Sequence, residues 1–167
     1  MHPSITSGAT LMAAVMPVPP KRRKSGIPTG NAGEYFVMGE LLRRSYDAQL
    51  ADRNTQGYDI LVGRPGDREL RKVQVKTVRT PPWYVKQADF AAGHLVPVTI
   101  YVVLGPPEGT KPVRYFIAPN AAVASTVHVP PNGKWAANGF MSLTGVAEYE
   151  NAWHIIFADA QSMKGTE

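Results

Sequence analysis

GYDILVGRPGDRELRKVQVKT, residues 57–77, is the stretch that decides the fold of this 167-residue chain. It contains two short runs in which apolar and polar residues alternate, 58–62 and 72–76. The turn-forming sequence Gly-Arg-Pro-Gly-Asp, residues 63–67, lies between them. Two alternating runs around such a turn predict a β-hairpin.

The centre of the turn fixes which residues of the hairpin face each other. If the hairpin is symmetric about the bond between Gly66 and Asp67, Asp59 lies opposite Gln74, because the two pairs of residue numbers have the same sum. Opposed residues share a face of the sheet, and so do residues two apart on one strand. We therefore expect Asp59, Gln74 and Lys76 to form one polar cluster on one face.

This cluster has the chemistry of a metal and phosphate site. The carboxylate of Asp59 and the amide oxygen of Gln74 are oxygen ligands, which Mg²⁺ prefers. The charge of Lys76 suits a phosphate or a charge developing on a phosphoryl oxygen. The alternative is an ordinary half-exposed hairpin with polar residues on its solvent face.

The order of these residues along the chain resembles the signature of a nuclease superfamily. Asp59 followed by Gln74-Val75-Lys76, with Gly33-Glu34 upstream at the head of a helix, is similar to the PD-(D/E)XK pattern. The Gln form resembles Mrr-like and Holliday-junction-resolvase-like small bacterial proteins. The stretches GNAGEYFVMGELLRR and NTQGYDILV add to the resemblance.

The resemblance implies a fold and an activity. The fold is an α/β, restriction-endonuclease-like αβββαβ core, a mixed sheet flanked by helices. The activity is a divalent-metal-dependent DNA endonuclease, with structure-specific cleavage as one option and RNA left open as a substrate. Mg²⁺ or Mn²⁺ would be held by Asp59, Gln74 and the carbonyl of Val75, and Lys76 would orient the attacking water. Glu34 would be a direct or indirect ligand, although it also has the spacing of a helix-capping residue after Asn31.

Two other functions stay open at this point. One is a catalytically inactive nucleic-acid-binding or interaction module on the same fold, because fold alone does not determine activity. The other is an accessory protein for another enzyme. A homodimer is one option for its assembly.

Composition separates a leader from the folded part. Residues 1–28 contain five prolines and the basic cluster Lys21 to Lys24, and they show no periodicity. We expect a flexible leader there, either a solvated tail, a nuclear address or a phosphate-binding arm. The single domain would span 29–167, in which 14 basic and 13 acidic residues nearly balance. The absence of cysteine and of long apolar runs fits a cytoplasmic protein that does not enter a membrane.

Positive charge gathers around the hairpin. Seven basic residues stand between 64 and 86, against two acids. Such a basic stretch is typical of a surface that binds a polyanion. Trp83 could stack on a base there, or it could instead anchor the loop in the core. The nucleic-acid contacts expected from this stretch are Arg64, Arg68, Arg71, Lys72, Arg79, Trp83 and Lys86.

The rest of the chain predicts the remaining elements. The first helix is expected from Asn31 or Gly33 to Tyr46, followed by an edge strand over 47–51. The β-branched run 96–104 predicts a central strand covered on both faces. Further expectations are a helix over 86–92, a strand over 113–118, a short helix over 120–124, and a helix or short strand over 148–160.

Overall fold

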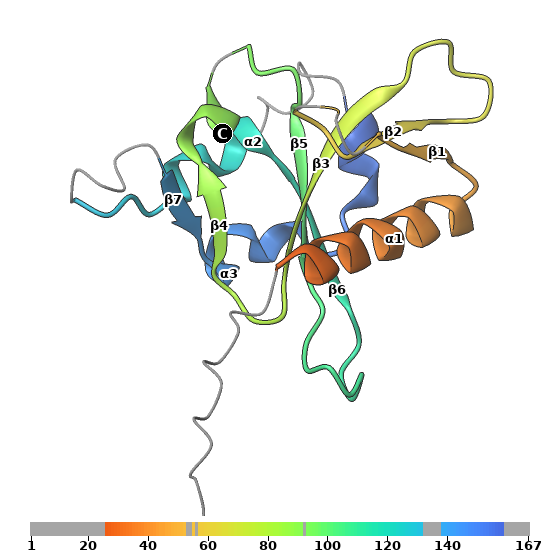
Figure 1. The fold of residues 1–167 in the computed structure, drawn as a ribbon. Helices are drawn as coiled ribbons and strands as arrows, with labels where there is room; N and C mark the ends of the chain where they lie inside the picture. Colours follow the sequence, from red (N-terminus) through yellow and green to blue (C-terminus); the bar gives the residue numbers. More distant parts are fainter. Residues whose placement is uncertain (1–25, 53–54, 56, 92, 132–137, 159–167) are drawn as a thin grey trace, which may run out of the picture.

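The computed structural model describes residues 26–52, 55, 57–91, 93–131 and 138–158. Within these residues, seven strands form two sheets, and the long helix α1 and several short helices pack around them (Figure 1). The strands are β1 (Asp47–Leu50), β2 (Ile60–Gly63), β3 (Arg71–Val78), β4 (Trp83–Lys86), β5 (Val98–Val103), β6 (Arg114–Pro119) and β7 (Asn138–Met141). The α-helices are α1 (Ile27–Arg43), α2 (Asn120–Val123) and α3 (Leu143–Val146). The 3₁₀ turns are η1 (Gln87–Phe90), η2 (Ala124–Thr126), η4 (Ala147–Tyr149) and η5 (Trp153–Phe157).

The main sheet is mixed and has the strand order β1-β2-β3-β5-β6. Strands β1, β2 and β3 pair antiparallel, β3 pairs parallel with β5, and β5 pairs antiparallel with β6. The predicted central hairpin and edge strand are therefore confirmed, and the strands expected over 96–104 and 113–118 are β5 and β6. Strand β5 is buried along nearly its whole length, as its β-branched sequence predicts.

Two apolar cores lie on opposite faces of this sheet. Val37 and Leu41 of α1 pack with the buried side chains of β2 and β3 on one face. On the other face, the small sheet of β4 and β7 packs with Tyr101 and Phe116. The residues of β3 alternate between the two cores, as a strand requires. Within the described residues, no helix has both the length and the apolar character needed to cross a membrane.

The first helix begins earlier than predicted. Helix α1 starts at Ile27, with Pro28 in its first turn, where the missing N–H of proline costs nothing. Gly26 is the N-cap residue, so the predicted capping role of Asn31 is wrong. Residues 27 and 28, assigned above to the leader, belong to the helix. Residues 1–25, which include the basic cluster, lie outside the described residues.

Two other predictions need correction, and the strands of the small sheet were not predicted. The helix expected over 86–92 is only the single 3₁₀ turn η1, which follows strand β4. The segment 148–160 forms neither an α-helix nor a strand where it is described, but the 3₁₀ turn η5 with parts of its neighbour η4. Strand β7, which pairs with β4, was not predicted. Short elements of this kind are set by tertiary packing more than by local sequence, so their sequence signal is weak.

Candidate active site at the edge of strand β3

The hairpin has the predicted register. Ile60 pairs with Val73 and Val62 pairs with Arg71, which is symmetric about the bond between Gly66 and Asp67. Strand β2 begins at Ile60, so Asp59 stands immediately before it. The main-chain N–H of Asp59 donates a hydrogen bond to the Val73 carbonyl at 2.9 Å. Asp59 is thus fixed beside β3 at the point where the β2 ladder stops.

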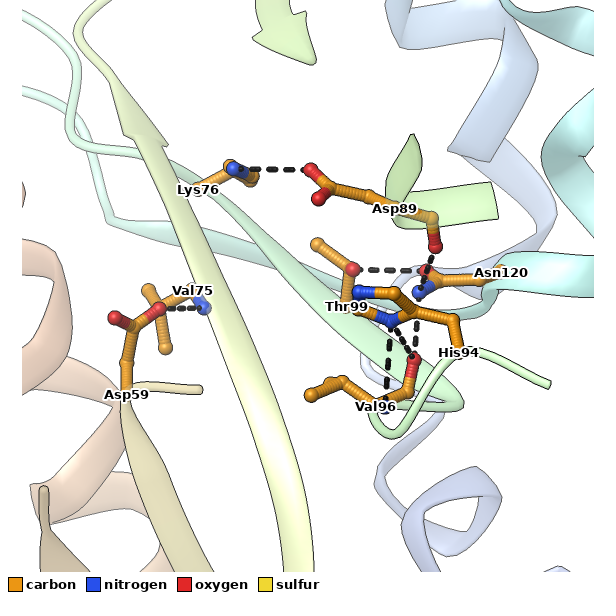
Figure 2. Close-up of polar contacts among 8 residues, drawn as sticks. All are labelled: Asp59, Val75, Lys76, Asp89, His94, Val96, Thr99 and Asn120. Atoms are coloured by element: carbon orange, nitrogen blue, oxygen red, sulfur yellow. Dashed lines mark hydrogen bonds and ion pairs between the residues drawn. The ribbon is translucent and has the colours of Figure 1, made fainter. Parts of the chain in front are cut away.

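The side chain of Asp59 extends this ladder. Its Oδ2 atom accepts a hydrogen bond from the Val75 N–H at 2.7 Å (Figure 2). If β2 were longer, one of its main-chain carbonyls would accept this hydrogen bond from Val75. Here the Asp59 carboxylate accepts it instead. The Asp59 carboxylate is thus directed at the main chain of the motif Gln74-Val75-Lys76.

The carbonyl of Val75 lies at the same edge. Along a strand, successive main-chain groups point alternately to its two neighbours. The Val73 carbonyl accepts from Asp59, whereas the Val78 carbonyl accepts from Leu104 on the other side of β3. By this alternation the Val75 carbonyl points to the side of Asp59. Asp59 and Val75 therefore bring two oxygen donors to one edge, as the predicted metal site requires.

Gln74 and Lys76 lie on the face of the sheet that is turned away from α1. Val73 and Val75 belong to the core beneath α1, and Thr77 touches this helix at Gly33. The alternate residues Gln74 and Lys76 must point to the opposite face. Figure 2 shows Asp59 on one side of β3 and Lys76 on the other.

The prediction that Asp59, Gln74 and Lys76 share one face is therefore correct only for Gln74 and Lys76. The Asp59 carboxylate lies at the edge of β3, because β2 begins only after it, at Ile60, and its side chain turns into the ladder.

Burial raises the pKa of the Asp59 carboxyl above its ordinary value. The hydrogen bond from Val75 and the charge of Lys76 both act in the opposite direction, and the nearby charge of Asp89 adds to the rise. Lys76 is thus close enough to Asp59 to influence its ionisation although it lies on another face. A cation bound at this edge would favour the ionised form of Asp59.

A cavity of about 570 Å³ joins Asp59 to helix α1. Its lining includes Glu34, Asp52, Tyr58 and Asp59. Glu34 lies well inside α1 because the helix begins at Ile27, so the capping interpretation of Glu34 is wrong. The structure brings Glu34 to the cavity that Asp59 lines, which is the position that the resemblance implies.

Asp89 belongs to the same neighbourhood, although no sequence pattern indicated it. Its Oδ2 atom lies 3.4 Å from the Lys76 Nζ atom, and Asp89 is only 9% exposed. It stands on the 3₁₀ turn η1, outside every motif described above, and it meets Lys76 only through the fold. Nothing in its spacing from Lys76 could have identified it.

The donor set of this edge fits a hard divalent cation. Asp59 and the Val75 carbonyl offer oxygens, and the Oε1 atom of Gln74 is buried without a hydrogen-bond partner among the described residues. Mg²⁺ is commonly held by one or two carboxylates and keeps several of its waters. No group of three or more His, Cys, Asp or Glu residues suited to a metal occurs in the described part of the chain. One carboxylate and one carbonyl therefore meet at this edge, and Gln74 offers an amide oxygen from the adjoining face of β3.

The basic residues that are predicted to contact nucleic acid lie around strand β3. Arg64 and Arg68 are exposed in the loop of the hairpin, and Arg79 is exposed just beyond the other end of β3. Arg71 and Lys72 are half-buried at the start of the strand, where Lys72 lies 5.1 Å from the ring centroid of Tyr58. Lys86 is exposed on β4. The charges thus lie at both ends of the strand that carries Gln74 and Lys76.

Trp83 is not available to a nucleic acid. Its side chain is completely buried, its indole N–H donates to the Val102 carbonyl at 3.1 Å, and its ring packs edge-on against Tyr101 and Phe116. The alternative interpretation, an anchor in the core, is the correct one. Its neighbour Tyr84 is 44% exposed and presents the aromatic surface instead.

Comparison with known proteins supports the architecture. No protein-family model and no curated protein matches the chain. The solved structure of a bacterial homing endonuclease, I-Ssp6803I, is similar over 84% of this chain and 98% of its own, with a TM-score of 0.51 and 17% sequence identity. Hjc, a Holliday junction resolvase from Archaeoglobus fulgidus, is similar over 71% of this chain and 88% of its own, with a TM-score of 0.46 and 14% identity. The likeness to the homing endonuclease shows that the chain has the mixed α/β, restriction-endonuclease-like fold that the resemblance implies.

Proposed function

We propose that this protein is a divalent-metal-dependent DNA endonuclease that hydrolyses phosphodiester bonds. The observation that carries the proposal is the hydrogen bond from Val75 to the Asp59 carboxylate, which places the acid beside the Gln74-Val75-Lys76 strand. The likeness to the homing endonuclease fold is consistent with this function. The basic residues at both ends of β3 suit a polyanionic substrate.

Each residue of the site has a role that its chemistry supports. Asp59, Gln74 and the Val75 carbonyl would hold Mg²⁺ or Mn²⁺, with Glu34 on the other side of the cavity. A bound divalent cation polarises the phosphoryl group and favours deprotonation of the attacking water. Lys76 would orient that water and stabilise the charge that develops on the phosphoryl oxygens.

The test is a cleavage assay with purified protein on linear, nicked and branched DNA, in Mg²⁺, in Mn²⁺ and in EDTA. We expect metal-dependent cleavage of at least one substrate by the wild type. Asp59→Ala should abolish cleavage while the fold is kept, because its side chain fills no apolar core. Lys76→Ala should also abolish cleavage, and it should lower the thermal midpoint because it leaves the buried Asp89 carboxylate without its partner. Asp47→Ala is the matched control, since it removes an exposed carboxylate from the edge strand β1.

A second candidate is a nucleic-acid-binding module without catalytic activity. The observations that favour it are the neutral Gln74 and the ion pair that joins Lys76 to Asp89. DNA binding without cleavage of any substrate, together with no effect of Mg²⁺ on thermal unfolding, would replace the nuclease proposal with this one.

A further inference from the structure

We propose that Asp89 is a positioning residue of the active site. Its carboxylate holds the ammonium group of Lys76 where it can stabilise charge on the scissile phosphate. The inference rests on the proposed nuclease function. It adds to that function an acid that lies outside the sequence motif and reaches the site from the far face of the sheet.

The contact between the two side chains is short and shielded from solvent. Lys76 Nζ and Asp89 Oδ2 are 3.4 Å apart, and the two side chains are 21% and 12% exposed (Figure 2). The separation is that of an ion pair without a well-formed hydrogen bond, and Asp89 Oδ2 is a buried atom without a hydrogen-bond partner among the described residues. A buried carboxylate is costly unless a positive charge lies beside it. Lys76 supplies this charge, so the fold holds the two groups together.

Asp89 itself is held in place by a buried polar clamp on β5. The side-chain amide of Asn120 donates to the Asp89 carbonyl at 3.1 Å and to the Val96 carbonyl at 2.9 Å. The Oδ1 atom of Asn120 accepts from the Thr99 hydroxyl at 2.8 Å. Thr99 is the register partner of Gln74, so the clamp ties the turn that carries Asp89 to the strand beside the motif.

The motif Gln74-Val75-Lys76 contains no acidic residue, so an acid that orients Lys76 must come from elsewhere in the fold. Gln74 is neutral, so β3 provides no negative charge within its motif to orient the lysine. A lysine side chain has four flexible methylene groups, and it must lose considerable rotamer freedom to present its charge at one point. A fixed carboxylate beside the ammonium group selects one arrangement.

The test compares Asp89→Asn and Asp89→Glu with the wild type. Asn keeps the shape of Asp89 and removes its charge, so Lys76 loses the group that orients it. We expect kcat for DNA cleavage to fall by roughly 10- to 100-fold, as is typical for a misplaced reacting group. KM should change little, and Asp89→Glu should recover part of kcat. Should Asp89→Asn fail to fold, Asp89→Glu still tests the geometry, since it keeps the charge and moves it by one methylene.

Two readouts separate positioning from other roles. Labelling of Lys76 by an amine-reactive reagent, followed by mass spectrometry, should be faster in Asp89→Asn because the ammonium group is released. The rise in thermal midpoint on adding Mg²⁺ should be the same as in the wild type, because Asp89 acts on Lys76 and not on the metal. Glu150→Gln is the matched control: it removes the acid of the Arg114–Glu150 ion pair, 2.7 Å long, without touching the site.

The outcomes distinguish this inference from the proposed function. An unchanged kcat in Asp89→Asn, or loss of the Mg²⁺-dependent shift, would overturn the positioning role. Absence of cleavage by the wild type would overturn the nuclease function and the catalytic role of Asp89 with it. In that case, faster labelling of Lys76 in Asp89→Asn than in the wild type would still support the contact between Lys76 and Asp89. Labelling at the wild-type rate would refute it.

Discussion

Gly33 on α1 packs so closely against Thr77 on β3 that a Cβ atom on Gly33 would lie 1.8 Å from Thr77 Oγ1. Only a residue without a side chain permits this approach of the helix to the strand. The contact fixes the height of α1 above β3, and Glu34 is the next residue of the helix. The geometry of the cavity between Glu34 and Asp59 therefore depends on a glycine.

The first prediction concerns Gly33→Ala. The added methyl group must displace Thr77 or the helix, so we expect a loss of about 1–3 kcal/mol of unfolding free energy, as for other overpacked sites. Gly39→Ala is the matched control on the same helix, since nothing lies within 4 Å of its Cβ position. That change should stabilise the protein by up to about 1 kcal/mol through helix propensity. Chemical denaturation of both variants measures the difference, and equal effects would contradict the close approach of helix and strand.

The second prediction concerns the charge of Asp59. Because the folded-state pKa of Asp59 is raised, its stabilising contribution is present at low pH and is lost as the pH rises from the ordinary value of 3.8 through the folded value. At neutral pH and without metal, Asp59→Asn should therefore raise the thermal midpoint, and the gain should vanish in acid. Added Mg²⁺ should stabilise the wild type only, by about 2.7 kcal/mol at 100 times its dissociation constant.

Asp67→Asn provides the contrast for this experiment. The main-chain N–H and the guanidinium of Arg64 lower the pKa of Asp67, so this carboxylate stabilises the fold above its ordinary pKa and loses that effect in acid. Its replacement should lower the thermal midpoint at neutral pH and leave any response to Mg²⁺ intact. If Asp59→Asn and Asp67→Asn shifted the thermal midpoint at neutral pH in the same direction, the buried environment described for Asp59 would be contradicted.

The third prediction concerns Gln74→Glu. This change places a second carboxylate near Asp59, and two like charges repel unless a cation lies between them. Without metal the variant should unfold at a lower temperature than the wild type. With Mg²⁺ or Mn²⁺ it should recover, bind the ion more tightly and keep its cleavage activity. Gln49→Glu on the edge strand β1 is the control, and a Gln74→Glu variant that metal does not rescue would argue against a metal site.

The fourth prediction concerns the exposed aromatic surface of β4. Tyr84 and Lys86 share the solvent face of this strand, because exposed and buried residues alternate along it. If single-stranded DNA crosses this face, Tyr84→Ala should weaken its binding by about 1–3 kcal/mol, the usual contribution of one stacked base. Tyr84→Phe should bind like the wild type, since it keeps the ring. If Tyr84→Ala bound single-stranded DNA as tightly as the wild type, β4 would not be part of the DNA-binding surface.

The fifth prediction concerns the basic cluster Lys21 to Lys24. Replacing all four residues with serine should leave the unfolding midpoint unchanged, because the cluster precedes helix α1 and is expected to add nothing to the core. It should also flatten the dependence of DNA affinity on salt, since each phosphate that a basic residue neutralises adds about 0.9 to the slope of log affinity against log salt. Titrations of labelled DNA at several salt concentrations measure this slope. A slope equal to that of the wild type would leave only a solvated tail.

The central hairpin could be predicted from sequence because its signal is local. The register of β2 and β3 follows from one turn and from alternation, so the position of Asp59 beside Gln74 needs no tertiary information. Strand β5 was equally clear, because a β-branched run of this length is typical of a buried strand.

Other features depended on contacts between distant parts of the chain. Trp83 and Tyr84 are adjacent aromatic residues, and only the packing of β4 against Tyr101 decides that the first is buried. Asp89 meets Lys76 because Asn120 clamps its turn to β5, which no local pattern indicates. The orientation of Asp59 also escaped prediction, since alternation holds within a strand and β2 begins one residue after Asp59.

The main chain of Val75 offers its N–H to Asp59 and its carbonyl to the same edge, and every genetically encoded residue except proline keeps both groups. An alanine scan across β3 would therefore pass over position 75 and show only a small packing loss. Replacing the peptide nitrogen between Gln74 and Val75 with an ester oxygen would delete the donor and keep the valine side chain. Chemical synthesis or semisynthesis, more than mutagenesis, is thus the way to probe the group on which this site is centred.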